Sequence, residues 1–417
     1  MNVERPATAC EITIIVPARN EEACLGDCLA SLVAQTGVTF EILVVDDSST
    51  DRTGEIARSF AGVRVIAPGL LPEGWTGKNN AVIAGAREAR GEWLLFTDAD
   101  TVHLPGALPR SLAEAREHGA ELLSYSPEQI AVTFWELATL PVVFAELARQ
   151  YPPSKVSDPA SPIAAANGQY ILIRRETYEA VGGHAAVAAN LLEDVALARA
   201  VKESGRRIRF RYAADAVRTR MYRNFRQLRE GWTKNLALLF PRPGWLAAKL
   251  LLIWGIGWGG SFWALIGFAG RERPWWSTVL ILAPMYLGMR LSRANFTWDM
   301  EVLGALFGMP MFSYLLLRSK KAHANGSVSW KGRTYFDGAS PSAAQRISSP
   351  SGTPAKSVLP SPPEGAGYSR SSLRKSALIC LLSQRGSGGL SWAAPEGADR
   401  GERLAALLKR CPDTKLA

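Results

Sequence analysis

The sequence predicts an α/β fold in which a mostly parallel sheet carries helices on both faces. Over the first hundred residues, apolar runs of strand length alternate with segments of helical periodicity, a pattern typical of parallel sheets. The loops after two of the strands carry paired aspartates. Because parallel strands end at one edge of a sheet, where such sheets bind their ligands, we expect these carboxylates to converge.

The predicted elements follow one another in a regular order. Ile12–Val16 predicts the first strand, and the apolar positions from Leu25 to Leu32 predict the helix after it. Ile130–Leu147 is apolar but interrupted by Pro141, which favours a buried or interfacial pair of helices. The other strands are expected at Phe40–Val45, Val63–Ile66 and Trp93–Phe96, with helices over Thr53–Phe60 and from Lys78 to Ala89.

Aspartates follow the second and fourth predicted strands, as Asp46-Asp47 and as Asp98-Ala99-Asp100. Two carboxylates two residues apart at a strand end can share one Mg²⁺ or Mn²⁺ with a diphosphate. Taken alone, such a tripeptide is more often a solvated turn in which the first aspartate caps the next segment. The second pair, at an equivalent place in the same sheet, favours the metal site.

An acidic pair, Glu193-Asp194, opens an apolar helix. Acidic residues in a first turn complement the helix dipole, so a purely structural role is an equal alternative. In the functional interpretation, one of these carboxylates takes the proton from an acceptor hydroxyl. The small residues near Gly168 and Gly183 allow close approach of the backbone, and His184 is as readily an ordinary loop histidine.

The formal charge of +10, from 48 Lys and Arg against 38 Asp and Glu, fits nucleic acid, an anionic membrane or a phosphorylated small molecule. Basic residues crowd between Arg206 and Arg242, just before an apolar segment, Leu246–Ala269, that is long enough to cross a bilayer. This is the positive-inside arrangement, with tryptophans where interfacial aromatics belong. Trp275–Leu291 and Val302–Leu317 are further apolar segments near the lower length limit.

We therefore expect a multi-pass protein of the cell (inner) membrane with a cytoplasmic catalytic domain and no nucleic-acid partner. Two crossings are favoured, with Val302–Leu317 re-entrant or interfacial. The expected parts are a catalytic domain over 10–242, transmembrane or interfacial helices over 243–320, a cytosolic segment over 321–336, and a disordered Ser-, Pro- and Gly-rich tail over 337–417. The first eleven residues hold no secretory signal, and five scattered cysteines indicate neither a disulfide scaffold nor a zinc ribbon.

Five motifs occur in the order found in family-2 glycosyltransferases, which this sequence resembles. They are Val16–Glu22, Val44–Asp51, Gly74–Asn79, Phe96–Thr101 and Leu192–Asp194. The stretch from Asn167 to Arg223 resembles the membrane-associated branch that glycosylates carotenoids and related polyisoprenoid lipids. The resemblance covers about residues 10–336 and implies a nucleotide-diphospho-sugar transferase fold of the GT-A type, with a Rossmann-like sheet followed by C-terminal transmembrane helices.

The resemblance also implies roles for particular residues. Asp194 would be the general base, supported by Glu193, and Asp98 with Asp100 would hold Mg²⁺ or Mn²⁺ on the donor diphosphate. The family's Q-x-x-R-W element is only approximated by Arg226–Trp232, so its register is open. The residues expected to bind the nucleotide sugar are Pro17, Arg19, Glu21, Asp46, Asp47, Lys78, Asp98, Gln169, Gln227, Arg229 and Trp232. Trp330–Tyr335 resembles a motif that closes related lipid glycosyltransferases.

The expected activity is metal-dependent, inverting transfer of a sugar from a nucleotide donor, UDP-glucose by resemblance, to a hydroxyl of a lipid, carotenoid or other polyisoprenoid acceptor. A processive polysaccharide synthase is the alternative within the same class, disfavoured by the imperfect Q-x-x-R-W element and the few apolar spans. A catalytically idle nucleotide-sugar-binding scaffold is disfavoured because all the carboxylates are present. A nucleic-acid-binding protein ranks last because no recognition helix or aromatic RNA-binding motif is in view.

Overall fold

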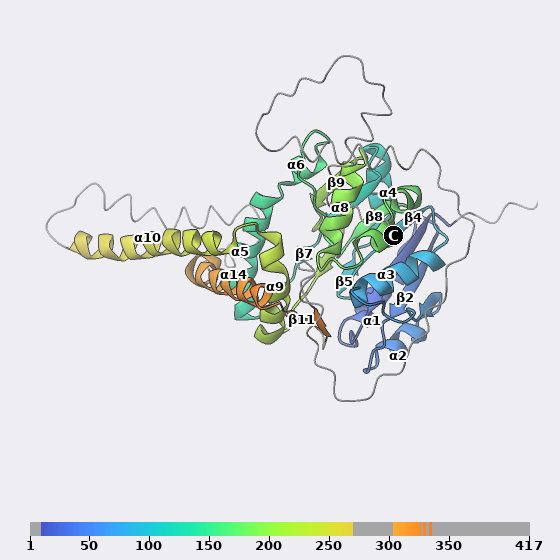
Figure 1. The fold of residues 1–417 in the computed structure, drawn as a ribbon, viewed down its shortest axis with the longest axis horizontal. Helices are drawn as coiled ribbons and strands as arrows, with labels where there is room; N and C mark the ends of the chain where they lie inside the picture. The colour runs from blue at the N-terminus through green and yellow to red at the C-terminus, as the bar shows by residue number, and fades with distance from the viewer. Residues whose placement is uncertain (1–9, 270–302, 327, 331–332, 336–417) are drawn as a thin grey trace, which may run out of the picture. The chain divides into compact units, whose positions relative to one another are not determined.

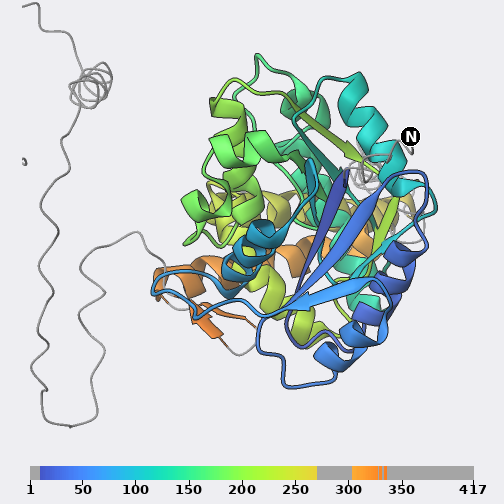
Figure 2. The same ribbon diagram turned by 90° about the vertical axis from the view of Figure 1, so that its right-hand side faces the viewer.

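The computed structural model describes residues 10–269, 303–326, 328–330 and 333–335. The predicted segment Trp275–Leu291 and the tail over 337–417 lie outside these residues. The described part is built around one large sheet, drawn in Figures 1 and 2 with helices on either side.

The large sheet has seven strands in the order β3-β2-β1-β4-β8-β6-β9. Neighbouring strands are parallel except around β8, which runs antiparallel to both β4 and β6. The expectation of a mostly parallel sheet is therefore confirmed. The strands are β1 (Ile12–Ala18), β2 (Phe40–Asp46), β3 (Val63–Ile66), β4 (Trp93–Phe96), β6 (Leu122–Ser126), β8 (Ile171–Arg174) and β9 (Ile208–Tyr212).

Both faces of the sheet are covered by helices, as the continuous apolar strands require. Ile14 and Val16 pack on one side with helices α1 and α4, while Ile15 packs on the other with α3 and α8. Alternation along the strand thus serves two cores. The covering helices are α1 (Leu25–Val33), α2 (Thr53–Ser59), α3 (Gly77–Glu88), α4 (Ala107–Glu117), α6 (Pro153–Ser157), α7 (Arg175–Ala180) and α8 (Glu193–Glu203), with the short η1 (Gly183–Val187).

A second, three-stranded sheet carries the chain away from the D-x-D motif. Its strands are β5 (Thr101–His103), β10 (Val217–Thr219) and β7 (Glu128–Gln129), with β10 in the middle. Thr219 Oγ1 donates a hydrogen bond to the main-chain oxygen of Asp100 at 3.1 Å. The residues after β10, which include the Q-x-x-R-W-like element, are therefore held beside the aspartates.

A cluster of helices with its own apolar core packs beside the sheet, and Figure 1 shows it in green to orange. It consists of α5 (Phe134–Gln150), α9 (Phe225–Leu239), α10 (Pro243–Ala269), the π-helical η3 (Gly304–Gly308) and α14 (Met309–Ala324). Buried residues of this core include Leu140, Trp232, Leu250 and Phe312. A hairpin of β11 (Val328–Trp330) and β12 (Arg333–Tyr335) lies against α9.

The expected break at Pro141 is wrong, because α5 runs through it as a single helix. Proline removes one main-chain hydrogen-bond donor. The residues before and after Pro141 are nevertheless buried in the helical cluster, so packing holds the helix together. A capping box between Thr133 and Glu136 fixes its start. Close packing against η3 depends on Gly308, where a Cβ atom would lie 2.1 Å from the main-chain oxygen of Ala138.

Within the described residues, no single helix has both the length and the apolarity needed to cross a bilayer; α9 and the first part of α10, Pro243–Gly259, meet that criterion only when taken together, with a bend of 108° between them.

Five arginines of the basic stretch form ion pairs with carboxylates of the same chain, so their positive charge is balanced within the fold. Each pairs with a carboxylate: Arg206 with Glu121, Arg209 and Arg211 with Glu114, Arg218 with Glu128, and Arg220 with Glu136. These glutamates lie 84 to 97 residues earlier in the chain. Counting charges within the stretch could not reveal them.

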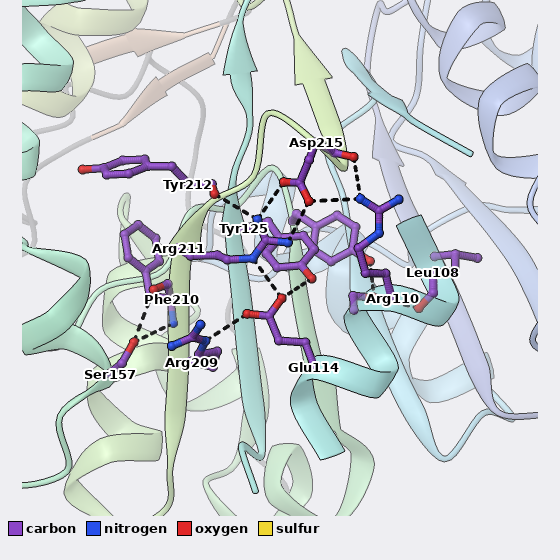
Figure 3. A network of polar contacts seen from close by, with 12 residues as sticks. Leu108, Arg110, Glu114, Tyr125, Ser157, Arg209, Phe210, Arg211, Tyr212 and Asp215 are labelled. Atoms are coloured by element: carbon purple, nitrogen blue, oxygen red, sulfur yellow. Dashed lines mark hydrogen bonds and ion pairs between the residues drawn. The ribbon is translucent and has the colours of Figure 1, made fainter. Parts of the chain in front are cut away.

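Glu114, on α4, connects two of these arginines with a tyrosine (Figure 3). Its Oε1 accepts from Arg209 Nε at 2.9 Å, and its Oε2 accepts from Arg211 Nε at 2.9 Å and from the Tyr125 hydroxyl at 2.7 Å. Arg211 also pairs with Asp215 at 2.7 Å. Burial works to raise the pKa of Glu114, but these hydrogen bonds outweigh it, so the pKa is lowered. The network ties α4 to β6 and β9.

We expect Glu114→Gln to lower the free energy of unfolding by about 2 kcal/mol near neutral pH, because a charged hydrogen-bonded partner is lost. Because its pKa is lowered in the fold, ionised Glu114 stabilises the wild type fully at pH values above about 4.3, the pKa of a glutamate in the unfolded chain. This contribution is lost as the pH falls from that value through the lower pKa of the folded state. Thermal melts across pH would show a shallower acid dependence for Glu114→Gln than for the wild type. Glu117→Gln, an exposed change on the same helix, should leave both quantities unchanged.

Candidate active site

A cavity of about 820 Å³ opens at the carboxyl ends of the parallel strands, where the sequence placed the site. It lies between the sheet and the helical cluster, with lining residues from both. Of the residues predicted for the site, the structure brings twelve to this cavity: Pro17, Arg19, Glu21, Asp47, Lys78, Asp98, Asp100, Gln169, Glu193, Asp194, Gln227 and Trp232. The lining does not include Asp46 or Arg229.

The loops after β1 and β2 form one end of the cavity and are fastened to each other. Arg19 donates to the main-chain oxygen of Asp47 at 2.6 Å. Asn20 and Ser48, one in each loop, have φ of 54° and 56°, a left-handed conformation that non-glycine residues rarely adopt. Asp47 faces the cavity, whereas Asp46 accepts a hydrogen bond of 3.0 Å from a main-chain amide of its own loop. Asp46 therefore shapes its loop and does not line the cavity.

At the centre of the cavity, the ammonium group of Lys78 bridges two carboxylates. Its Nζ lies 2.8 Å from Asp98 Oδ1 and 2.8 Å from Glu193 Oε1. Lys78 is in the first turn of α3, which begins behind the Thr76 cap in the Gly74–Asn79 motif. Burial works to lower the pKa of Lys78, but the two carboxylates outweigh it and raise the value, so the side chain is a fixed cation.

The two adjacent carboxylates Glu193 and Asp194 have opposite pKa shifts. Burial raises the pKa of Asp194, and the charge of Glu193 raises it further. Burial also acts to raise the pKa of Glu193, but Lys78 and then Lys234 outweigh it and lower the value. Lys78 touches Glu193 and not Asp194, so Glu193 stays ionised while Asp194 is the better proton acceptor. This division fits a general base at Asp194 with Glu193 in support.

The Asp194 carboxylate is held by main-chain donors on both oxygens. Gly168 N donates to Oδ2 at 3.0 Å and Val195 N donates to Oδ1 at 2.8 Å. A Cβ atom at Gly168 would lie 3.1 Å from Lys78 Nζ and 3.5 Å from Asp194 Oδ2. Residue 168 is therefore glycine because the backbone must lie directly against the acid pair and its lysine, as the sequence suggested.

The two candidates in the Q-x-x-R-W-like element take different positions. Gln227 and Trp232 line the cavity, and Gln227 Oε1 accepts from the main-chain amide of Arg223 at 2.8 Å. Arg229 instead holds its guanidinium 5.9 Å from the centre of the Phe225 ring, outside the cavity lining. The helix period decides this, since residues two positions apart on a helix face different ways.

Gln169 and His184 are both engaged in contacts within the fold. Gln169 Nε2 donates to Thr219 Oγ1 at 3.3 Å, and its Oε1 accepts from Gln129 at 3.4 Å. His184 is buried, with Nδ1 3.1 Å from the Tyr178 hydroxyl, and burial lowers its pKa to about 4. His184 is thus a neutral packing residue behind the acid pair, and Gln169 shapes the floor of the cavity.

The cavity lining also contains residues that the motifs did not predict, among them Tyr151, Tyr222, Arg223, Lys234 and Asn235. Burial lowers the pKa of Lys234, against the opposing charge of Glu193, which places this cation within electrostatic range of the acid pair. Lys234 follows Gln227 by seven residues, two turns of the same helix. That spacing was a usable sequence signal, whereas no local pattern distinguished Tyr151.

The aspartates of the D-x-D motif provide hard oxygen ligands of the kind that Mg²⁺ and Mn²⁺ take. No group of three or more His, Cys, Asp or Glu side chains in the described ranges has the arrangement of a complete metal site. Asp98 and Asp100 both line the cavity beside the loops of β1 and β2. Two carboxylates fit a cation whose remaining ligands are phosphate oxygens and water, which is common for Mg²⁺.

Comparison of the sequence with known proteins finds glycosyltransferases. Residues 13–182 match the family model for glycosyl transferase family 2. A 4,4'-diaponeurosporenoate glycosyltransferase of Staphylococcus aureus is 29% identical over 342 residues, which span 78% of this chain and 88% of that protein.

The fold of this chain also matches parts of solved glycosyltransferase structures. A mannosyltransferase from Pyrobaculum calidifontis, in complex with GDP-Man and Mn²⁺, is 16% identical with a TM-score of 0.44, covering 76% of this chain and 88% of that one. TarS 1-349 of S. aureus, in complex with UDP-GlcNAc, is 16% identical with a TM-score of 0.36, and the match covers 79% of this chain and 98% of that one.

The family match begins in β1 and contains both aspartate motifs and the Lys78 motif. Residues 13–182 therefore form a domain that matches glycosyl transferase family 2, and the protein is a glycosyltransferase with an α/β fold.

We expect Asp194→Asn to reduce sugar transfer by at least about a hundredfold, because the amide cannot accept the acceptor's proton. A base at Asp194 works only in its ionised form, and the pKa of Asp194 is raised. The transfer rate should therefore fall as the pH is lowered. The fall should occur at a higher pH than it would for a base with the ordinary aspartate pKa of about 3.9. Initial rates against pH, with thermal melting as a check on folding, measure both effects.

Glu203→Gln, an exposed change at the far end of the same helix, is the matched control and should behave as the wild type. Near-normal turnover by a folded Asp194→Asn variant would overturn the assignment of the base.

Proposed function

We propose that the protein is a metal-dependent, inverting glycosyltransferase that moves a sugar, with glucose as the expected sugar, from a UDP-sugar to a hydroxyl of a carotenoid or other polyisoprenoid acceptor. The observation that carries this proposal is the Lys78 bridge between Asp98 and Glu193, because it joins the expected diphosphate site to the carboxylate that stands beside the expected base, Asp194. The carotenoid class of the acceptor is supported by the name of the S. aureus relative, whereas that name denotes a carboxylate, so the acceptor hydroxyl is our own expectation.

The proposed reaction is a single displacement. Asp194 accepts the proton of the acceptor hydroxyl, and the hydroxyl oxygen bonds to the anomeric carbon while the bond from that carbon to the diphosphate oxygen breaks. One in-line displacement inverts the anomeric configuration. The main-chain bonds from Gly168 and Val195 hold the base in place, which supplies the positioning that such a step requires.

Negative charge develops on the departing nucleoside diphosphate. We propose that Asp98 and Asp100 hold Mg²⁺ or Mn²⁺, which when bound neutralises that charge. Lys78 supplies a second, permanent cation at the same place. Arg19 and Asp47, fastened to each other at the far end of the cavity, would hold the nucleoside.

We further propose that the enzyme acts at the cytoplasmic face of the cell membrane, where a polyisoprenoid acceptor resides. The support is the apolar segment Leu246–Ala269 and the exposed apolar side chains on α10, such as Leu252 at 63% and Ile256 at 57% exposure. Exposed apolar residues in a row are typical of surfaces that meet a membrane or a partner.

The test is transfer of radiolabelled sugar into extracted lipid. Full-length protein in membranes is incubated with UDP-glucose, UDP-GlcNAc or GDP-mannose and with a polyprenyl alcohol or a hydroxycarotenoid. We expect label in the organic phase with one UDP-sugar, identified as a monoglycoside by mass spectrometry. A labelled polymer would instead favour a processive synthase, and no transfer with any pair would favour an idle binding protein.

Metal dependence is tested in the same assay. We expect EDTA to abolish transfer and added Mn²⁺ or Mg²⁺ to restore it. Asp100→Ala should lower the rate by two orders of magnitude or more while the protein stays folded, because stabilisation of the leaving group is worth several kcal/mol. Full activity in EDTA would exclude the metal role and leave Lys78 as the leaving-group cation.

A further inference from the structure

The cavity has a second kind of lining, opposite in character to the charged end. Six apolar or aromatic side chains, which we call the apolar wall, come from α5 and the residue after it, from β9 and from the end of α9. They are Phe144, Leu147, Tyr151, Phe210, Tyr212 and Leu239.

Most of the wall results from the periodicity of two elements, α5 and β9. Phe144, Leu147 and Tyr151 are spaced three and four residues apart, so they share one face at the end of α5. Phe210 and Tyr212 alternate along β9 with Arg209 and Arg211, whose side chains form the Glu114 network on the opposite face. One strand therefore supplies both an ionic anchor and an apolar surface.

The polar groups of the wall are largely used within the protein. The Tyr151 hydroxyl donates to the main-chain oxygen of Leu239 at 3.1 Å, which joins the ends of α5 and α9. The main-chain amide of Phe210 donates to Ser157 Oγ at 3.0 Å. A saccharide bound here would bury many hydroxyl groups with few hydrogen-bond partners, which is unfavourable. A hydrocarbon chain needs no hydrogen-bond partners.

The wall belongs to the same cavity as the proposed base. Leu192 and Val195, on either side of Glu193 and Asp194, line it too. Burial raises the pKa of Tyr151 and the charge of Asp194 adds to this effect, which is consistent with Tyr151 lying within electrostatic range of the base. A molecule lying on the wall would thus have one end within reach of Asp194.

We propose that the apolar wall binds the hydrocarbon chain of the acceptor next to its reactive hydroxyl, and that it selects long-chain lipid alcohols over saccharides. This inference rests on the proposed function. The wall is formed by described residues alone and adds a defined acceptor subsite to the transferase.

Adjacent leucines at the end of α9 allow a matched test. Leu239 lines the cavity, whereas Leu238 is 38% exposed and lies outside the lining. Kinetics are measured for the wild type, Leu239→Ser and Leu238→Ser with a five-carbon and a long polyprenyl alcohol. We expect the wild type to have a KM that falls with chain length, by up to about fourfold for each methylene that contacts the wall.

Leu239→Ser should raise the KM for the long alcohol about tenfold and change the KM for the donor and for the short alcohol little. Leu238→Ser should match the wild type. Leu147→Ser, from α5, is a second wall variant in case Leu239→Ser is poorly folded, and thermal melting reports folding. An equal loss with both alcohols, or no change with the long one, would overturn the inference.

The two proposals fail in distinguishable ways. If the wild type transfers sugar to no lipid alcohol, the proposed function is wrong. If it transfers sugar but shows no dependence on chain length and no effect of the wall variants, only the subsite is wrong. A wild type that prefers an oligosaccharide to any lipid alcohol would overturn the subsite while leaving the transferase class intact.

Discussion

The Lys78 ammonium bridges Asp98 and Glu193 at 2.8 Å each, and it thereby holds the end of β4, the start of α3 and the start of α8 at one point. Two carboxylates so close together would repel each other without a cation between them. The β4 aspartate belongs to the expected diphosphate site, and the α8 glutamate stands beside the expected base. Donor and acceptor chemistry are therefore coupled through one side chain.

The same cation gives two neighbouring carboxylates different roles. Lys78 contacts Glu193 and lowers its pKa, while Asp194, buried beside that negative charge, has its pKa raised. Their different surroundings move the pKa values of the two carboxylates apart, as happens in other enzymes that use paired carboxylates. Gly168 is part of this arrangement, because its amide holds Asp194 and a side chain there would press against Lys78. The site thus depends on a backbone position as much as on charged groups.

Beyond the acid pair, the excess positive charge and the apolar surfaces have separate structural uses. Arginines of β9 pair with Glu114 on one face of the strand, and Phe210 and Tyr212 line the cavity on the other. The positive charge of this strand therefore stabilises the catalytic fold, and its apolar side chains shape the space where the acceptor would lie. A basic stretch beside an apolar segment has here an intramolecular explanation for five of its arginines.

The sequence by itself determined the strands and helices of the first hundred residues and the convergence of Asp47, Asp98 and Asp100, because local periodicity and the direction of parallel strands fix both. It also identified the acid pair through its motif. Only the tertiary structure decided that Asp46 turns into its loop, that Arg229 leaves the cavity and that α5 continues through Pro141. These depend on hydrogen bonds and packing between segments far apart in the chain, as do the glutamate partners of the arginines and the apolar wall, and no local pattern encodes such contacts.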